Sequence, residues 1–88
     1  MARMEVGDFG AATAAPANSA ELFFELGLKY CLGQGVDRDY VAAHKWFNLA
    51  ALKGNTAARD YRSEISREMD AVQIAEAQRQ ARDWLTVH

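Results

Sequence analysis

The sequence predicts an all-α fold, and three observations support this. Apolar side chains recur every three or four residues in four successive segments, which is the spacing of one face of an α-helix. No segment has the apolar–polar alternation of a half-buried strand. Glycines or helix-capping residues separate the four segments. We therefore expect about four helices arranged as antiparallel hairpins.

Residues 1–19 are predicted to be a disordered N-terminal arm. They are rich in Ala and Gly, contain the only proline (Pro16) and have no periodic apolar face, so they cannot bury enough surface to offset the entropy of ordering. Phe9 is the one large aromatic group, and it leaves two interpretations open: an unstructured lead-in or a short binding motif. The expected helical domain covers residues 20–85, followed by a flexible tail, 86–88.

The first helix is expected from residue 20 onward, where Asn18 and Glu21 have the spacing of a capping box. Gly27 lies within its apolar stripe, and a glycine there indicates a close approach of a second helix. The turn Gly33-Gln34-Gly35 ends this helix. The stripe itself consists of Leu22, Phe23, Leu26 and Tyr30.

A second helix is expected over 39–53, with Asp39 at its start and Gly54 as a left-handed residue after its end. Asn55 caps a third helix over about 56–68. The inner faces are Ala42, Ala43, Trp46, Phe47, Ala50 and Ala51 in the second helix, and Ala58, Tyr61, Ile65 and Met69 in the third.

Asp70 caps a fourth helix over about 71–85, in which Arg79 and Asp83 are spaced to form an i, i+4 ion pair. Its apolar face consists of Ile74, Ala77, Ala81, Trp84 and Leu85.

Residues 20–58 resemble a Sel1-like repeat, a relative of the tetratricopeptide repeat. The matching motifs are Leu-Gly-x-x-Tyr, Gly-x-Gly-Val, an Asp, Ala-x-x-Trp and Ala-Ala-x-x-Gly. They are supplied by Leu26, Gly27, Tyr30, Gly33, Gly35, Val36, Asp39, Ala43, Trp46, Ala50, Ala51, Gly54 and Ala57. The resemblance implies a helical-hairpin scaffold for protein–protein interaction. Residues 57–84 are similar to a degenerate second unit with a closing helix.

Composition and charge exclude several classes of function. The formal charge of −2 and the pI near 5.6 give no reason to expect nucleic-acid binding. No apolar run approaches the ~18–20 residues that span a bilayer, and no signal-peptide core is present. The single cysteine, Cys31, fits a cytoplasmic protein. Because no apolar run is long enough to span a bilayer, we expect no membrane partner.

No arrangement typical of catalysis or metal binding stands out. His44 and His88 are isolated, and Cys31 is more consistent with packing than with a reactive thiol. We expect no cofactor, no metal and no enzymatic activity. An enzyme would instead require turnover that depends on Cys31 or His44.

A repeat protein of barely two hairpins should leave apolar surface open, because repeats bury their faces against neighbouring repeats. We expect exposed groups among the large apolar side chains Phe23, Phe24, Leu28, Tyr40, Trp46, Phe47, Tyr61 and Trp84. Such a surface is typical of a protein-binding or self-association site. On the helical body, the candidate contact residues are Phe24, Leu28 and Tyr40. The competing interpretation is one closed four-helix core.

The C-terminal residues Trp84, Leu85, Val87 and His88 are the leading candidates for partner contact. If the last helix frays after Leu85, they form a short apolar peptide of the kind that ATP-dependent proteases of the Lon type engage. The chain also resembles small stress-induced bacterial activators of Lon. The sequence thus predicts a cytoplasmic, non-catalytic adaptor or protease regulator, either a monomer or a weak homo-oligomer. The alternatives are a homo-oligomeric scaffold of the Sel1-like type, and docking of Trp84 and Leu85 onto the preceding helix.

Overall fold

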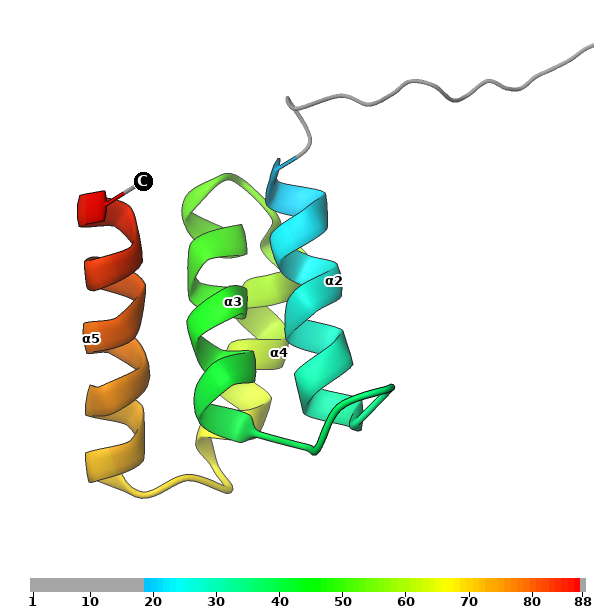
Figure 1. Ribbon diagram of the computed structural model, residues 1–88, viewed down its shortest axis with the longest axis vertical. Coiled ribbons are helices and arrows are strands. Elements are labelled where there is room, and N and C mark those ends of the chain that lie inside the picture. Colours follow the sequence, from blue (N-terminus) through cyan, green and yellow to red (C-terminus); the bar gives the residue numbers. More distant parts are fainter. Residues whose placement is uncertain (1–18, 88) are drawn as a thin grey trace, which may run out of the picture.

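The computed structural model describes residues 19–87, and this part of the chain is all-α (Figure 1). The four helices are α2 (Ser19–Leu32), α3 (Tyr40–Leu52), α4 (Thr56–Ser66) and α5 (Ala71–Val87). Successive helices run in opposite directions, so α2 and α4 point one way and α3 and α5 the other. Residues 1–18 of the predicted arm, including the proposed cap Asn18, lie outside the described residues. Ser19, the last residue of the predicted arm, is the first residue of α2.

Short polar contacts start the last three helices where the sequence predicts them. The Asp39 carboxylate accepts from the Ala42 N–H at 3.1 Å, and the Asn55 side chain accepts from the Ala58 N–H at 2.8 Å. At α5, Asp70 and Gln73 form a reciprocal capping box with bonds of 2.8 and 3.0 Å. Each cap satisfies backbone donors that the first turn of a helix leaves unpaired.

The helix ends differ slightly from the predicted ones. The third helix ends at Ser66 rather than near residue 68, and the fourth runs to Val87 instead of 85. Thr86 and Val87 are therefore helical, and the Thr86 hydroxyl donates to the Arg82 carbonyl at 3.0 Å. The flexible tail expected at 86–88 is wrong for these two residues, because the helix continues through them.

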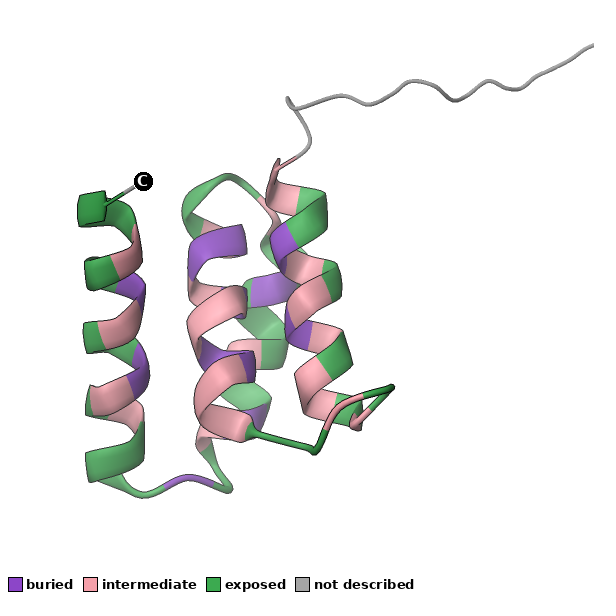
Figure 2. Ribbon diagram, viewed as in Figure 1, coloured by how far each residue is buried: buried purple, intermediate pink, exposed green. Residues whose placement is uncertain are grey.

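Helix α3 is the centre of the packing. It contacts α2 on one side, α4 behind and α5 on the other side (Figure 1), whereas α4 and α5 scarcely touch each other. The fully buried side chains Ala43, Phe47 and Ala50 come from α3, and the buried stripe of α5, Ala77 and Ala81, faces it (Figure 2). Helices α4 and α5 therefore do not pack against each other as a closed hairpin. Instead, α5 packs on α3, which belongs to the first hairpin.

The close approach predicted at Gly27 is present. Gly27 is buried, and a Cβ at this position would overlap the ring of Phe47 on α3. The absence of a side chain lets the ring lie directly on the α2 backbone. The turn glycines Gly33 and Gly35 have φ of 71° and 76°, as the predicted turn requires.

Aromatic rings link the helices in two groups of three. The first aromatic cluster consists of Phe23, Trp46 and Trp84, from α2, α3 and α5. The second aromatic cluster consists of Phe24, Phe47 and Tyr61, from α2, α3 and α4. Each cluster takes one residue from a sequence-adjacent pair on α2 and one from a pair on α3. This division follows from the ~100° rotation between neighbouring residues of a helix.

Replacing Gly27 with alanine tests the α2–α3 contact. In an exposed helix the change would stabilise by about 1 kcal/mol, because alanine has the higher helix propensity. Here the new Cβ meets the Phe47 ring, so we expect the free energy of unfolding to fall by about 1–3 kcal/mol in urea titrations followed by circular dichroism. Ser63→Ala, on the exposed face of α4, is the control and should change the free energy of unfolding by less than about 0.5 kcal/mol. A G27A variant as stable as the wild type would contradict the tight contact.

Candidate functional site

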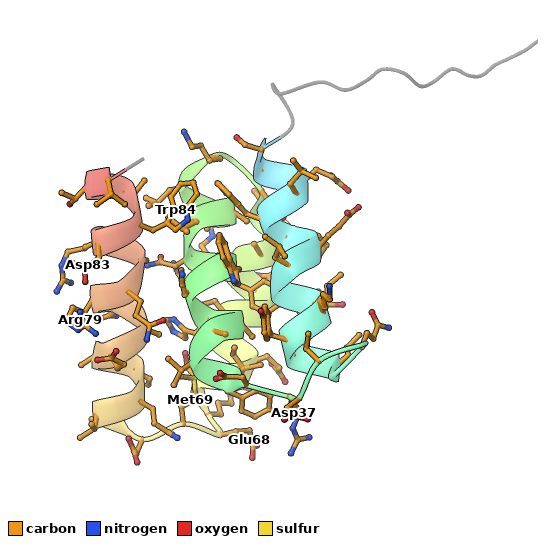
Figure 3. The ribbon with its side chains drawn as sticks, viewed as in Figure 1. Asp37, Glu68, Met69, Arg79, Asp83 and Trp84 are labelled. Atoms are coloured by element: carbon orange, nitrogen blue, oxygen red, sulfur yellow. The ribbon has the colours of Figure 1, made fainter. Side chains whose placement is uncertain are left out.

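The first aromatic cluster fixes the C-terminal end of α5 to the body. The Trp84 ring lies with its centroid 5.1 Å from that of Phe23 and 5.9 Å from that of Trp46, in edge-to-face geometry with both. Figure 3 shows Trp84 pointing from α5 toward α3 and α2. Such pairs add about 0.5–1.5 kcal/mol beyond the burial of apolar area. The alternative interpretation expected Trp84 and Leu85 to dock onto α4. The Trp84 ring does pack on the helical body, but against α2 and α3, and Leu85 stays exposed.

An apolar groove borders this cluster. Its volume is about 460 Å³ and its walls come from three helices: Leu22, Phe23, Glu25, Leu26 and Lys29 of α2, Trp46 of α3 and Trp84 of α5. Most of the wall is apolar, with the charged groups Glu25 and Lys29 at the α2 side. A groove of this size and lining can receive one or two large apolar side chains of a partner.

A second, shallower hollow meets the groove at Trp84. It has a volume of about 280 Å³ and is lined by Lys45, Arg79, Gln80, Asp83, Trp84 and Val87. The Lys45 ammonium lies 4.5 Å from the centroid of the Trp46 ring. Arg79 bonds to Asp83 at 2.6 Å, as the spacing predicts, and also pairs with Glu76. The apolar groove thus has a charged flank on the α5 side.

The last turn of α5 exposes two apolar side chains, and one of them, Val87, lines this hollow. Leu85 is 44% exposed and Val87 is 73% exposed. His88 lies outside the described residues. Two of the predicted C-terminal contact residues are therefore available on an ordered helix.

The predicted contact residues on the body are not open surface. Phe24, Leu28 and Tyr40 are half-buried and pack against the core, and Phe24 belongs to the second aromatic cluster. The sequence predicts that some of eight large apolar side chains are exposed. Of these eight, only Tyr61 is exposed in the described part of the chain. The others with high exposure are Leu22, Leu32, Leu52, Val72, Leu85 and Val87. Most of the aromatic rings close the core because their area rewards burial most, and apart from Tyr61 the exposed large side chains are aliphatic.

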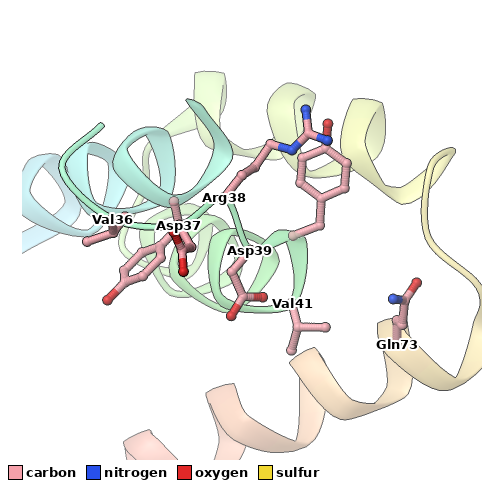
Figure 4. Close-up of a pocket in the computed structure, with 8 residues that line it drawn as sticks. Val36, Asp37, Arg38, Asp39, Val41 and Gln73 are labelled. Atoms are coloured by element: carbon pink, nitrogen blue, oxygen red, sulfur yellow. The ribbon is translucent and has the colours of Figure 1, made fainter. Parts of the chain in front are cut away.

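The turn between α2 and α3 borders another hollow, of about 520 Å³ (Figure 4). It is lined by Tyr30, Val36, Asp37, Arg38, Asp39, Tyr40, Val41 and Gln73. Two of its charged groups have structural roles: Asp39 caps α3, and the Arg38 guanidinium lies 5.2 Å from the centroid of the Tyr40 ring. These two side chains therefore serve the turn and the start of α3.

Cys31 is not arranged as a nucleophile. It is half-buried, and burial raises the pKa of its thiol, while the positive charge of Arg38 offsets only part of this rise. The thiolate, which is the reactive form, is therefore disfavoured. Within residues 19–87, no three His, Cys, Asp or Glu side chains are grouped so that they could hold a metal ion.

His44 is a buried polar group that the sequence did not reveal. Its Nε2 lies 3.1 Å from the Ser66 hydroxyl, 22 residues further along the chain. That hydroxyl donates its proton to the Arg62 carbonyl at 2.7 Å, so Nε2 carries the hydrogen and donates to Ser66. The other ring nitrogen, Nδ1, is buried without a hydrogen-bond partner. The pair joins α3 to α4, and the serine proton is already committed to the backbone.

Comparisons with protein-family models, with curated proteins and with solved structures found no match to this chain. Among the described helices, none combines the length and the apolar character needed to cross a membrane.

The His44 environment predicts that stability falls in mild acid. Burial, and next the positive charge of Arg62, lower the pKa of the imidazole below its ordinary value of about 6.5. Above that pH both folded and unfolded states are neutral at His44 and no penalty arises. As the pH falls below about 6.5, the unfolded chain takes up a proton that the folded chain refuses, so the free energy of unfolding drops by up to about 1.4 kcal/mol per pH unit.

Urea titrations between about pH 7.5 and about pH 5.5 measure this effect, since carboxylates titrate mainly below that range. His44→Gln retains a donor toward Ser66, and the free energy of unfolding of this variant should be nearly independent of pH in this range. An equal slope in the wild type and in H44Q would contradict the assignment.

Proposed function

We propose that this chain is a non-catalytic protein–protein interaction module, an adaptor or regulator of a partner protein. The observation that carries the proposal is the apolar surface around the C-terminal end of α5. There, exposed Val87 lines a hollow that shares Trp84 with the apolar groove, and exposed Leu85 lies on the same helix turn. Exposed apolar side chains beside an apolar groove are typical of a protein-binding site.

We further propose that the scaffold is a Sel1-like repeat followed by a degenerate unit. The support is the position of the motif residues: Gly27 admits the Phe47 ring, Gly33 and Gly35 form the turn with positive φ, and Asp39 caps α3. The open hairpin of α4 and α5 is consistent with a unit that ends a stack instead of continuing it.

For the partner we propose an ATP-dependent protease of the Lon type, in the cytoplasm. Such proteases engage exposed apolar segments, and the last turn of α5, with Leu85 and Val87, supplies one. Because the backbone of both residues is already helical, binding here would cost less ordering entropy than binding of an unstructured tail.

Substitutions at the end of α5 test the proposal. The full-length chain should raise the rate at which a purified Lon-type protease degrades fluorescent casein with ATP. L85S/V87S should need at least about tenfold more protein for half of the effect, because each lost apolar contact contributes about 1 kcal/mol or more.

Val72→Ser is the matched control, since Val72 is 78% exposed at the opposite end of the same helix. It should act like the wild type, and circular dichroism should show that all three proteins keep their helices. The proposal fails if the wild type does not change the protease rate, or if V72S and L85S/V87S are equally impaired.

A further inference from the structure

Helix α2 has an outward stripe that is not used in the fold. It consists of Leu22, Glu25, Lys29 and Leu32, spaced by three, four and three residues, and all four are exposed. Leu22 is 55% and Leu32 is 59% exposed. The spacing is that of the a and d positions of a coiled coil, which form one continuous seam along a helix.

The order of the side chains along this stripe is symmetric: leucine, acid, base, leucine. If a second α2 lies antiparallel to the first about a two-fold axis, Leu22 faces Leu32 of the second copy, and Glu25 faces Lys29 of the second copy. The reverse pairs form at the same time, because a two-fold interface uses the same patch on both chains. Two leucine contacts and two ion pairs then form without any like charges in opposition.

We propose that this stripe is a self-association surface, and that its occupant is a second copy of the chain packed through α2. Neither Glu25 nor Lys29 forms an ion pair within residues 19–87, whereas Arg67, Arg79 and their acidic neighbours are already paired. Leu26, half-buried beside the stripe, borders the apolar groove and widens the surface that the second α2 covers.

Charge complementarity favours a copy over the chain's own N-terminal segment. Residues 1–18 carry two acids, Glu5 and Asp8, and one base, Arg3, whereas a second α2 brings one acid and one base in the order that matches the stripe. The length of α2 limits the strength of the dimer. Fourteen residues of helix span about 21 Å, which gives an interface smaller than those of stable dimers. The association is therefore weak, concentration-dependent and sensitive to salt.

Charge reversal at the two central positions tests the pairing. Sedimentation equilibrium of the full chain from about 10 µM to about 1 mM in low salt should show a monomer–dimer equilibrium for the wild type. Glu25→Lys and Lys29→Glu should each dimerise at least about tenfold more weakly, because like charges then face each other twice. An equimolar mixture of the two variants should regain the dimer, since one copy then presents two lysines and the other two glutamates. The double variant E25K/K29E should also regain it.

Asp60→Lys, an exposed site on α4, makes the same change in net charge and should leave the wild-type equilibrium unchanged. The inference is overturned if the wild type stays monomeric at about 1 mM, if the mixture fails to associate, or if D60K weakens the dimer as much as E25K. None of these outcomes depends on the protease assay, because self-association is measured on the chain alone, without a protease.

Discussion

The structure depends on the contact between the Phe47 ring and the backbone of α2 at Gly27. A bare Cα at Gly27 lets a fully buried aromatic side chain of α3 occupy the space where another residue would place its Cβ. The second aromatic cluster forms around Phe47, because Phe24 and Tyr61 pack against the same ring. With α3 held in this way against α2 and α4, its remaining side is available for α5. Helix α3 is thus the one described helix that packs against each of the other three.

Local features of the sequence predict local structure well. The caps at Asp39, Asn55 and Asp70 and the ion pair of Arg79 with Asp83 depend on residues three or four apart, so spacing alone reveals them. The count and the approximate limits of the helices follow from the same short-range signals. Even the close approach at Gly27 is predictable, because a glycine within an apolar stripe lowers helix propensity and so indicates a packing role at that position.

Long-range packing is the part that the sequence does not reveal. The contact of His44 with Ser66 joins residues 22 positions apart, and neither position shows a pattern that would indicate the other. The packing of α5 on α3 instead of α4 is likewise a long-range choice. It depends on which of the two helices presents the larger apolar face to α5, and residue spacing within α5 does not indicate this. The sequence indicates that some large apolar side chains stay exposed, but it does not indicate which: of those expected, Tyr61 is exposed and the others are buried or half-buried. The other exposed large apolar side chains are aliphatic, and Leu85 and Val87 are among them.

The exposed end of α5 owes its order to Trp84. Because α4 and α5 scarcely touch, the last helix is held mainly through α3, and near its C-terminus the first aromatic cluster supplies the contact. Residues that follow Trp84 by one and three positions are then presented on a fixed helix turn. A binding surface that is ordered beforehand loses less conformational entropy when a partner docks. The side chain that first indicated a binding tail therefore anchors the proposed binding surface, and the proposed contacts come from its neighbours.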